Sequence, residues 1–190
     1  DFTQPDFVRL TNAPNAPEWK ISSSAELDSA RSSSTSSLER RVLLPIGGGK
    51  DSALLLEMLE QAHRPYDILL SYPQSPAAKM IANESKAGQI FQIHRHFDSQ
   101  LFELNKKGYL NGHTPFSARL AIESSFLALL AGHSQVLLAN ESSANEGNVP
   151  FHGTVVNHQY SKTFEFEEKF RKYVEEYLSP APEYLSALRP

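Results

Sequence analysis

The sequence feature that most constrains the fold is a short apolar run that stops at three consecutive glycines. Residues 42–46 (Val-Leu-Leu-Pro-Ile) are typical of a buried strand, and the glycines at 47–49 end it abruptly. The next segment repeats apolar residues between Leu55 and Ala62 with the spacing of one helix face. We therefore expect a strand, a tight loop and a helix that begins near Ser52.

The glycines and the polar residues after them predict a phosphate-binding loop. Adjacent glycines take positive φ and lack a Cβ, so their backbone N–H groups can turn toward an anion that approaches closely. The start of the helix adds unpaired amides and the positive end of its dipole. The residues that we expect to contact phosphate are Gly47, Gly48, Gly49, Lys50 and Ser52. The alternative is a sharp strand-to-helix turn that binds nothing.

The loop is not a Walker A loop, because that pattern needs glycine and Ser or Thr where Leu44 and Asp51 stand. Residues 47–52 (Gly-Gly-Gly-Lys-Asp-Ser) instead resemble the PP-loop of the ATP pyrophosphatase superfamily, whose usual pattern is Ser-Gly-Gly-x-Asp-Ser. The resemblance implies an adenine nucleotide alpha hydrolase-like fold that grips the pyrophosphate of ATP and transfers AMP to a substrate oxygen. Gly47 departs from the usual Ser and removes one hydroxyl donor.

Composition narrows the classes of protein. The 190 residues suffice for one domain, and a net charge of −4 with a pI near 6.0 disfavours a nucleic-acid surface. The absence of cysteine excludes disulfides, thiolate zinc sites and thiol-based sulfur transfer. No apolar run approaches the ~20 residues of a membrane span. Without a signal peptide or an initiating Met, we expect a trimmed or internal part of a cytoplasmic protein.

The pattern along the chain predicts the α/β class, with an open, mostly parallel sheet and helices on both faces. We expect a Ser/Pro-rich lead segment or linker at residues 1–38 and a PP-loop ATP-binding domain at residues 39–190. Further strands are predicted at 67–72, 89–97 and 135–140, and further helices at 77–86, 98–107, 118–131 and 164–178.

Two of these helices have distinctive surfaces. The helix at 118–131 is apolar almost all round, so we expect it to be buried on every side. The helix at 164–178 carries three i,i+4 pairs of opposite charge, among them Glu167 with Arg171, and we expect these charges to form a solvated face.

A polar stretch at 140–148 follows the predicted buried strand at 135–140. In open α/β sheets ligands bind beyond the carboxyl ends of the strands, and this loop leaves its strand at the same edge as the glycines. The stretch therefore is a candidate part of the site, although an ordinary hydrophilic loop is the alternative. Residues 155–162 bring further His, Gln, Tyr, Ser and Lys side chains ahead of the last helix.

Four motifs in order resemble the UDP-N-acetylmuramoyl-L-alanyl-L-glutamate epimerases. They are Leu-Pro-Ile-Gly-Gly-Gly-Lys-Asp-Ser (44–52), Gly-Tyr-Leu-Asn-Gly-His-Thr-Pro-Phe-Ser (108–117), Ala-Asn-Glu-Ser-Ser-Ala-Asn-Glu (139–146) and Val-Asn-His-Gln-Tyr-Ser-Lys (156–162). The resemblance implies an ATP- and Mg²⁺-dependent isomerase of peptidoglycan precursor synthesis, with a UDP-muramoyl dipeptide as its substrate. Members of that family are longer on the N-terminal side.

The resemblance also implies roles for particular residues. Gly47, Gly48, Gly49 and Ser52 would hold the β,γ-phosphates of ATP, Lys50 would balance their charge, and Asp51 would reach Mg²⁺. Asn140, Glu141 and Asn145 would bind the nucleotide, and Glu146 would join Asp51 at the metal. For Glu141, Asn145 and Glu146, completing the magnesium shell and binding the ribose are both open. His158 and Lys162, with His113 behind them, are the candidates for proton transfer or for gripping the adenylate. For the residues beyond the glycines, a purely structural hydrogen-bonding role is the alternative.

Other functions fit part of the same pattern. A different PP-loop adenylating enzyme, such as an amide-forming ligase, would share the loop and differ only in what attacks the adenylate. A non-catalytic ATP-binding remnant would bind ATP without releasing pyrophosphate. The loop chemistry disfavours a Walker-type ATPase or kinase.

Overall fold

The computed structural model describes residues 41–95, 97–109, 115–147, 149–180 and 182–189. The predicted lead segment at 1–38 lies outside these residues, and so does the predicted start of the ATP-binding domain at residue 39. The division of the chain at residue 38 therefore stays a prediction.

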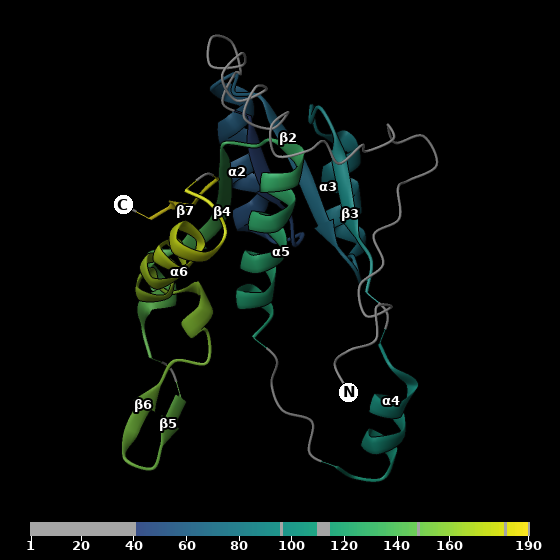
Figure 1. Ribbon diagram of the computed structural model, residues 1–190, viewed down its shortest axis with the longest axis vertical. Helices are drawn as coiled ribbons and strands as arrows, with labels where there is room; N and C mark the ends of the chain where they lie inside the picture. The colour runs from purple at the N-terminus through teal and green to yellow at the C-terminus, as the bar shows by residue number, and fades with distance from the viewer. Residues whose placement is uncertain (1–40, 96, 110–114, 148, 181, 190) are drawn as a thin grey trace. The chain divides into compact units, whose positions relative to one another are not determined.

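The main sheet has five parallel strands in the order β3-β2-β1-β4-β7, with β1 at its centre. Figure 1 labels the other four strands of this sheet. Val42 of β1 lies opposite Tyr66 on β2 and Gln135 on β4. The strands are β1 (Val42–Pro45), β2 (Tyr66–Ser71), β3 (Ile90–Ile93), β4 (Gln135–Glu141) and β7 (Glu183–Leu188). A separate antiparallel pair consists of β5 (Val149–Phe151) and β6 (Thr154–Val156). The predicted α/β class and parallel sheet are confirmed.

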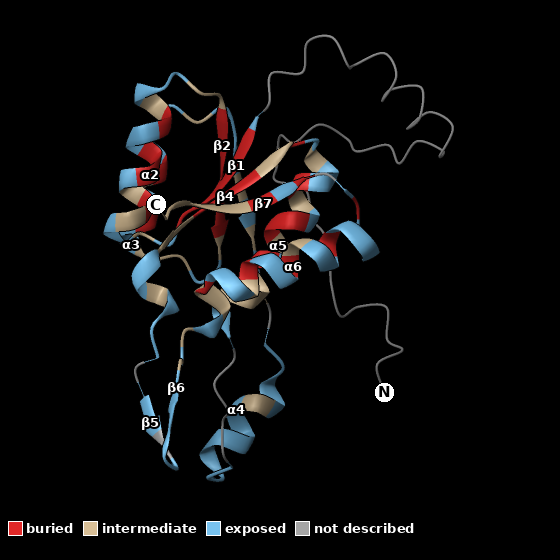
Figure 2. Cartoon of the chain, turned by 90° about the vertical axis from the view of Figure 1, so that its left-hand side faces the viewer, coloured by how far each residue is buried: buried red, intermediate tan, exposed pale blue. Residues whose placement is uncertain are grey.

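Helices cover both faces of the sheet, α2 and α3 on one and α5 and α6 on the other (Figure 2). The helices are α2 (Lys50–Gln61), α3 (Pro76–Glu84), α4 (Ser99–Lys106), α5 (Phe116–Ala131) and α6 (Phe164–Tyr177), and the 3₁₀ turns are η1 (Ser142–Asn145) and η2 (Tyr160–Lys162). Among the described residues, no helix is both long and apolar enough to cross a membrane.

Strand β1 is buried on both of its faces. Val42 and Leu44 pack into the core beneath α2 and α3, whereas Leu43 packs into the core beneath α5 and α6, and all three are fully buried. Alternate side chains of a strand point to opposite faces, so a central strand between two helical layers favours apolar residues at successive positions. The unbroken apolar run at 42–46 reflects this requirement.

The expectation that the helix at 118–131 is buried all round is wrong. Helix α5 buries only a face of small residues (Ala121, Ser124, Ser125 and Ala128). Ile122 and Phe126 are 53% and 45% exposed. Small side chains let the helix approach the sheet closely, Leu120 and Leu127 pack at the edge of the core, and other large apolar side chains point outward. An apolar helix without a polar face gives the sequence no signal of which side meets the sheet.

The expectation of a solvated charged face on α6 is wrong for Glu167, which is only 4% exposed. Its carboxylate forms an ion pair with Arg189 at 3.2 Å and accepts a hydrogen bond from the Ser186 N–H at 3.2 Å. Both partners come from β7 and the residue after it. Strand β7 was not among the strands predicted from the sequence, so the partners of Glu167 could not be anticipated.

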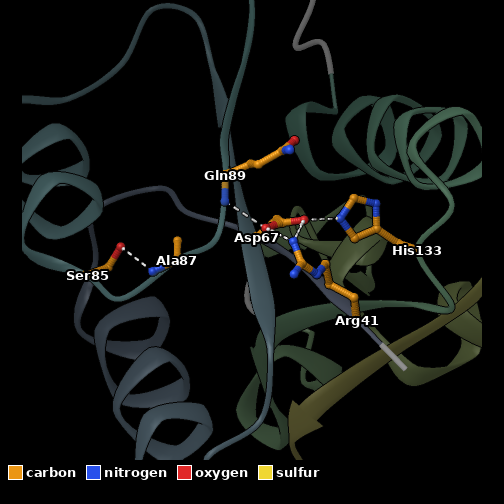
Figure 3. A network of polar contacts seen from close by, with 6 residues as sticks. All are labelled: Arg41, Asp67, Ser85, Ala87, Gln89 and His133. Atoms are coloured by element: carbon orange, nitrogen blue, oxygen red, sulfur yellow. Dashed lines mark hydrogen bonds and ion pairs between the residues drawn. The ribbon is translucent and has the colours of Figure 1, made fainter. Parts of the chain in front are cut away.

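A buried polar network joins the amino ends of four strands (Figure 3). Asp67 on β2 accepts hydrogen bonds from Arg41 at 3.2 Å, from His133 Nε2 at 2.8 Å and from the Gln89 N–H at 2.7 Å. The side chains of Asp67 and His133 are 3% and 1% exposed. Because a buried carboxylate needs such donors, the network fixes the strands at the edge opposite the glycines.

Leu69 and Leu130 test the burial pattern directly. Leu69 on β2 is fully buried, so we expect Leu69→Ala to lower the free energy of unfolding by about 2–5 kcal/mol. Leu130 on α5 is 47% exposed, and Leu130→Ala should change it by no more than about 0.5 kcal/mol. Urea denaturation followed by circular dichroism measures both values. A loss at Leu130 as large as that at Leu69 would contradict the described orientation of α5.

His133 should make stability depend on pH. Burial lowers the pKa of His133 despite its hydrogen bond to Asp67, and its buried Nδ1 has no partner among the described residues. A histidine in the unfolded chain titrates near 6.5, so below this pH the unfolded chain binds more protons than the folded chain. We expect the free energy of unfolding to fall as the pH is lowered through this range, by up to about 1.4 kcal/mol per pH unit for one proton.

The measurement is urea denaturation at pH values between 8 and 5. His133→Gln should flatten the slope below pH 6.5, and His94→Gln, at an exposed position, should leave it unchanged. An identical slope in the wild-type chain and in His133→Gln would rule out this histidine as its source.

Candidate functional site

The candidate site lies at the carboxyl ends of β1 and β4, two neighbouring strands from which the chain continues to opposite faces of the sheet. After β1 the chain enters α2 on one face, and after β4 it continues to α6 on the other face. In doubly wound sheets, ligands bind beyond the carboxyl ends of the two neighbouring strands at such a switch point. The glycines at 47–49, here called the glycine loop, follow β1, and Glu141 ends β4.

The glycine loop has one position that only glycine suits. Gly48 has φ +87°, and a Cβ there would lie 2.4 Å from Ser75 Oγ and 2.7 Å from the Ala78 backbone nitrogen. Gly47 accepts a hydrogen bond from Ser75 Oγ at 3.2 Å. Ser75 also caps α3, so the loop rests against the start of a second helix. Gly47 and Gly49 face open space instead.

The start of α2 presents free backbone donors. Gly49 is its N-cap residue and supplies no side chain to pair with the first amides of this 12-residue helix. Ser52 is buried, and its hydroxyl donates to the Gly49 carbonyl oxygen at 2.9 Å. In this conformation Ser52 therefore holds the loop in place. The unpaired amides and the helix dipole suit an anion such as phosphate.

Charged side chains gather across the switch point. Lys50 Nζ lies 2.5 Å from Asp51 Oδ1 and 2.5 Å from Glu141 Oε1. The hydrogen bonds to Asp51 and Glu141 raise the pKa of Lys50, and the hydrogen bond from Lys50 is the main cause that lowers the pKa of Glu141. One ammonium and two carboxylates leave this cluster a net charge of −1. Such a pair of carboxylates can take part in holding a divalent cation.

The two asparagines predicted to bind nucleotide make structural contacts. Asn140 donates to Ser186 Oγ at 3.0 Å and so joins β4 to β7. Asn145 accepts a hydrogen bond from the Phe164 N–H at 2.7 Å, at the first residue of α6. Their predicted roles toward a ligand stay predictions.

The predicted metal ligand Glu146 is exposed. The carboxylate that shares Lys50 with Asp51 is that of Glu141, and the role of Glu146 toward a metal stays a prediction. Within the described ranges no three His, Asp or Glu side chains come close enough together to hold a metal by themselves. Magnesium sites in nucleotide-binding proteins use one or two protein carboxylates and complete the shell with phosphates and water, so Asp51 with Glu141 fits that donor set.

Two of the candidates for proton transfer, His158 and Lys162, lie in a segment next to the loop after β4. Asn157 donates to the Ala144 carbonyl oxygen at 2.7 Å, which holds the segment 157–162 against η1. Within that segment His158 is exposed and Lys162 is partly buried. His113 lies outside the described residues. The roles of all three in chemistry stay predictions.

A second charged cluster, which the sequence patterns did not predict, lies at the same edge of the sheet. Arg119 on α5 forms an ion pair with Glu123, and both contact Ser71 Oγ at the end of β2. Arg95, after β3, donates to the Tyr72 carbonyl oxygen at 2.9 Å. The sequence signal that could have indicated this cluster is an Arg and a Glu four residues apart in an otherwise apolar helix.

A cleft of about 510 Å³ lies elsewhere, at the amino ends of β4 and β7 and the end of α6. Its lining includes Gln135, Arg171 and Glu183. It lacks the free helix amides and the glycine loop, so its size does not make it the phosphate site.

The fold and the glycine loop define an α/β domain with a glycine-rich turn and unpaired helix amides at its switch point. The family described as the MurL N-terminal domain matches residues 9–187, and this chain belongs to that family. The resemblance drawn from the four motifs is thereby confirmed.

Two relatives carry the same name, UDP-N-acetyl-alpha-D-muramoyl-L-alanyl-L-glutamate epimerase. The protein from Xanthomonas oryzae pv. oryzae is 37% identical over 154 residues, which are 80% of this chain and 34% of the relative. The protein from Micromonospora sp. is 31% identical over 189 residues, which are 97% of this chain and 39% of the relative. The chain thus spans between about a third and two fifths of the length of these relatives.

Similarity to solved structures is weaker. The crystal structure of gox2253 is 12% identical with a TM-score of 0.40, covering 77% of this chain and 50% of that one. This similarity is too weak to assign a fold family, and the adenine nucleotide alpha hydrolase-like fold stays a prediction.

Gly48 and Gly49 form a matched pair for testing the loop. Gly48→Ala places a Cβ at positive φ against backbone, so we expect a loss of at least about 1–2 kcal/mol in the free energy of unfolding. Gly49→Ala, with open space around it and φ −87°, should cost less than about 1 kcal/mol. Thermal denaturation measures both. Equal stability of the two variants would contradict the contact of Gly48 with α3.

Proposed function

We propose that this chain is the ATP-binding part of an enzyme that epimerises the terminal L-glutamate of UDP-N-acetylmuramoyl-L-alanyl-L-glutamate to D-glutamate, by way of an acyl-adenylate. Membership of the MurL N-terminal domain family and the names of the relatives support the substrate and the reaction. The observation that carries the ATP-binding role is the glycine loop, with the free amides of α2 and Lys50 beside it.

The chemistry explains why an epimerase would use ATP. The α-proton of a glutamate residue is a poor acid while its carboxylate is charged, since its removal places a carbanion beside an anion. Adenylation cancels that charge and lets the carbonyl oxygen accept electron density. A base can then remove the proton, an acid can return one to the other face, and hydrolysis releases AMP.

The glycine loop and the first turn of α2 are proposed to hold the β- and γ-phosphates through backbone amides. Lys50 is so exposed, at 79%, that its side chain can exchange its carboxylate partners for phosphate oxygens. Asp51 and Glu141 are then free to face Mg²⁺, with Glu146 as a further carboxylate in the same loop. The ion would neutralise phosphate charge during transfer.

His158, Lys162 and His113 are the proposed groups for proton transfer or for holding the adenylate. Two groups on opposite faces of the glutamate Cα suit an inversion, because the proton leaves one face and returns to the other. His158 and Lys162 come from one short segment that is held against the loop after β4. Their positions beyond the carboxyl end of β4 support this assignment.

A second function has one observation in its favour. Since the chain spans between about a third and two fifths of the length of its relatives, it could bind ATP and leave catalysis to the remainder of a longer protein. Such a chain would bind ATP with Mg²⁺ and release no pyrophosphate by itself.

Incubation of the chain with ATP, Mg²⁺ and the UDP-muramoyl dipeptide tests the proposal. We expect AMP and pyrophosphate, and D-glutamate after acid hydrolysis. Lys50→Gln should lower the rate of AMP release by about 10²–10³-fold, because it removes a charge that stabilises the phosphates during transfer. Lys172→Gln, at an exposed position on α6, is the matched control and should keep the rate.

The outcomes separate the candidate functions. AMP together with D-glutamate supports the epimerase. AMP with unchanged L-glutamate contradicts epimerisation and favours another adenylating enzyme. ATP binding without AMP release favours the non-catalytic domain, and an absence of ATP binding overturns both proposals.

A further inference from the structure

Two arginines meet at the carboxyl end of β2, outside the glycine loop. Arg95 Nε donates to the Tyr72 carbonyl oxygen at 2.9 Å, and Arg119 Nη1 donates to Ser71 Oγ at 3.3 Å. The two guanidinium groups are therefore held by consecutive residues of one strand end. They come from different elements, Arg95 from the segment after β3 and Arg119 from the first turns of α5.

The positive charges of the two arginines exceed the negative charge beside them. Glu123 pairs with Arg119, and among the described residues Arg95 forms no ion pair. Two arginines and one carboxylate leave one positive charge in excess. Burial is the main cause that lowers the pKa of Arg95, the like charge of Arg119 lowers it further, and the charge of Glu123 offsets part of this shift. A bound anion would remove both penalties, since it would solvate and neutralise the guanidinium groups.

The neighbouring rings hold the arginines without occupying their donors. The guanidinium of Arg95 lies 5.0 Å from the ring centre of Phe97, and that of Arg119 lies 4.8 Å from the ring centre of Phe116. A ring contacts the flat face of a guanidinium and leaves the N–H groups in its plane available. Nη2 of Arg119 is buried and has no hydrogen-bond partner among the described residues, so one donor of this guanidinium is left unsatisfied.

The arginine pair and the glycine loop are joined by one short segment. Ser71 contacts Arg119 at the start of residues 71–75, and Ser75 donates to the Gly47 carbonyl oxygen at the end of that segment. The helix that carries Arg119 covers one face of the sheet, and the helix after the glycine loop covers the other. Both sites thus lie at the carboxyl edge and approach it from opposite faces.

We propose that Arg95 and Arg119 form a subsite for an oxyanion of the acidic substrate, separate from the phosphates of ATP. The identity of the substrate rests on the proposed function. That substrate offers two sources of the oxyanion, the diphosphate of its UDP moiety and a carboxylate of its dipeptide. Arginine forms paired hydrogen bonds with either group.

Isothermal titration of the chain with UDP, with L-alanyl-L-glutamate and with ATP plus Mg²⁺ tests the subsite. We expect Arg95→Gln and Arg119→Gln to weaken binding of UDP or of the dipeptide by at least about tenfold, and to leave ATP affinity within about twofold. Arg95→Gln is the main variant, because it keeps the ion pair between Arg119 and Glu123. Arg171→Gln on α6 is the matched control for loss of one positive charge, and thermal denaturation verifies that each variant is folded.

The ligand that responds identifies the source of the oxyanion. A tenfold loss for UDP assigns the arginines to the diphosphate, and a tenfold loss for the dipeptide assigns them to a carboxylate. If neither ligand binds, or if Arg171→Gln weakens binding as much as Arg95→Gln does, the subsite is overturned. A parallel loss of ATP affinity would also overturn it, because the arginines would then belong to the nucleotide site.

The subsite and the proposed function fail in different ways. A chain that binds UDP through Arg95 but releases no AMP contradicts only the proposed function. A chain that forms AMP and D-glutamate with an unchanged KM for the UDP-muramoyl dipeptide in Arg95→Gln contradicts only the subsite.

Discussion

The burial of β1 between two helical layers is the constraint on which the candidate site depends. Because every side chain of this strand is buried, the strand has no freedom to shift, and the chain must turn at its carboxyl end within a few residues. Glycine makes that turn possible, and Gly48 packs against Ser75 and Ala78. The rigid core thereby holds the amides of the loop and of α2 at a fixed place beside the end of β4.

The charges around the loop follow from the same arrangement. Lys50 begins α2 and Glu141 ends β4, so the neighbouring positions of the two strands bring together residues that are 91 apart in sequence. The resulting cluster has two carboxylates and one ammonium, all partly or largely exposed. Exposed ion pairs contribute little to stability, which makes a role toward a charged ligand a better account of the cluster than a role in folding.

Local patterns in the sequence predicted the parts of the fold that local chemistry determines. The apolar run at 42–46, the glycines and the helix after them were recognised because strand burial, turn geometry and helix spacing each have a short-range signal. Strand β7 was not predicted, because Pro180 and Pro182 just before it are typical of a loop. The ion pair of Glu167 with Arg189, which follows this strand, was therefore not predicted either. The exposed face of α5 was not predicted, because the side of a helix that faces the core is recognised from the contrast between a polar and an apolar face. Helix α5 lacks a polar face of this kind.

The site shows the same division. The glycine loop, Lys50 and Asp51 could be found from sequence, since adjacent residues form them. The contact of Lys50 with Glu141 and the pairing of Arg119 with the end of β2 join distant segments, and only the sheet order reveals them. Asn140 and Asn145 were predicted from sequence to bind a ligand, whereas the structure shows that they hold the polar loop in place.

The central claim is that a carboxylate of the substrate is activated by transfer of AMP. The most direct measurement uses the UDP-muramoyl dipeptide labelled with ¹⁸O in its glutamate carboxylates, incubated with ATP, Mg²⁺ and the chain, with mass spectrometry of the AMP formed. Attack of the carboxylate on the α-phosphate, followed by hydrolysis at the carbonyl carbon, predicts AMP that carries one ¹⁸O. Unlabelled AMP, formed at the same rate with and without the dipeptide, would contradict the account.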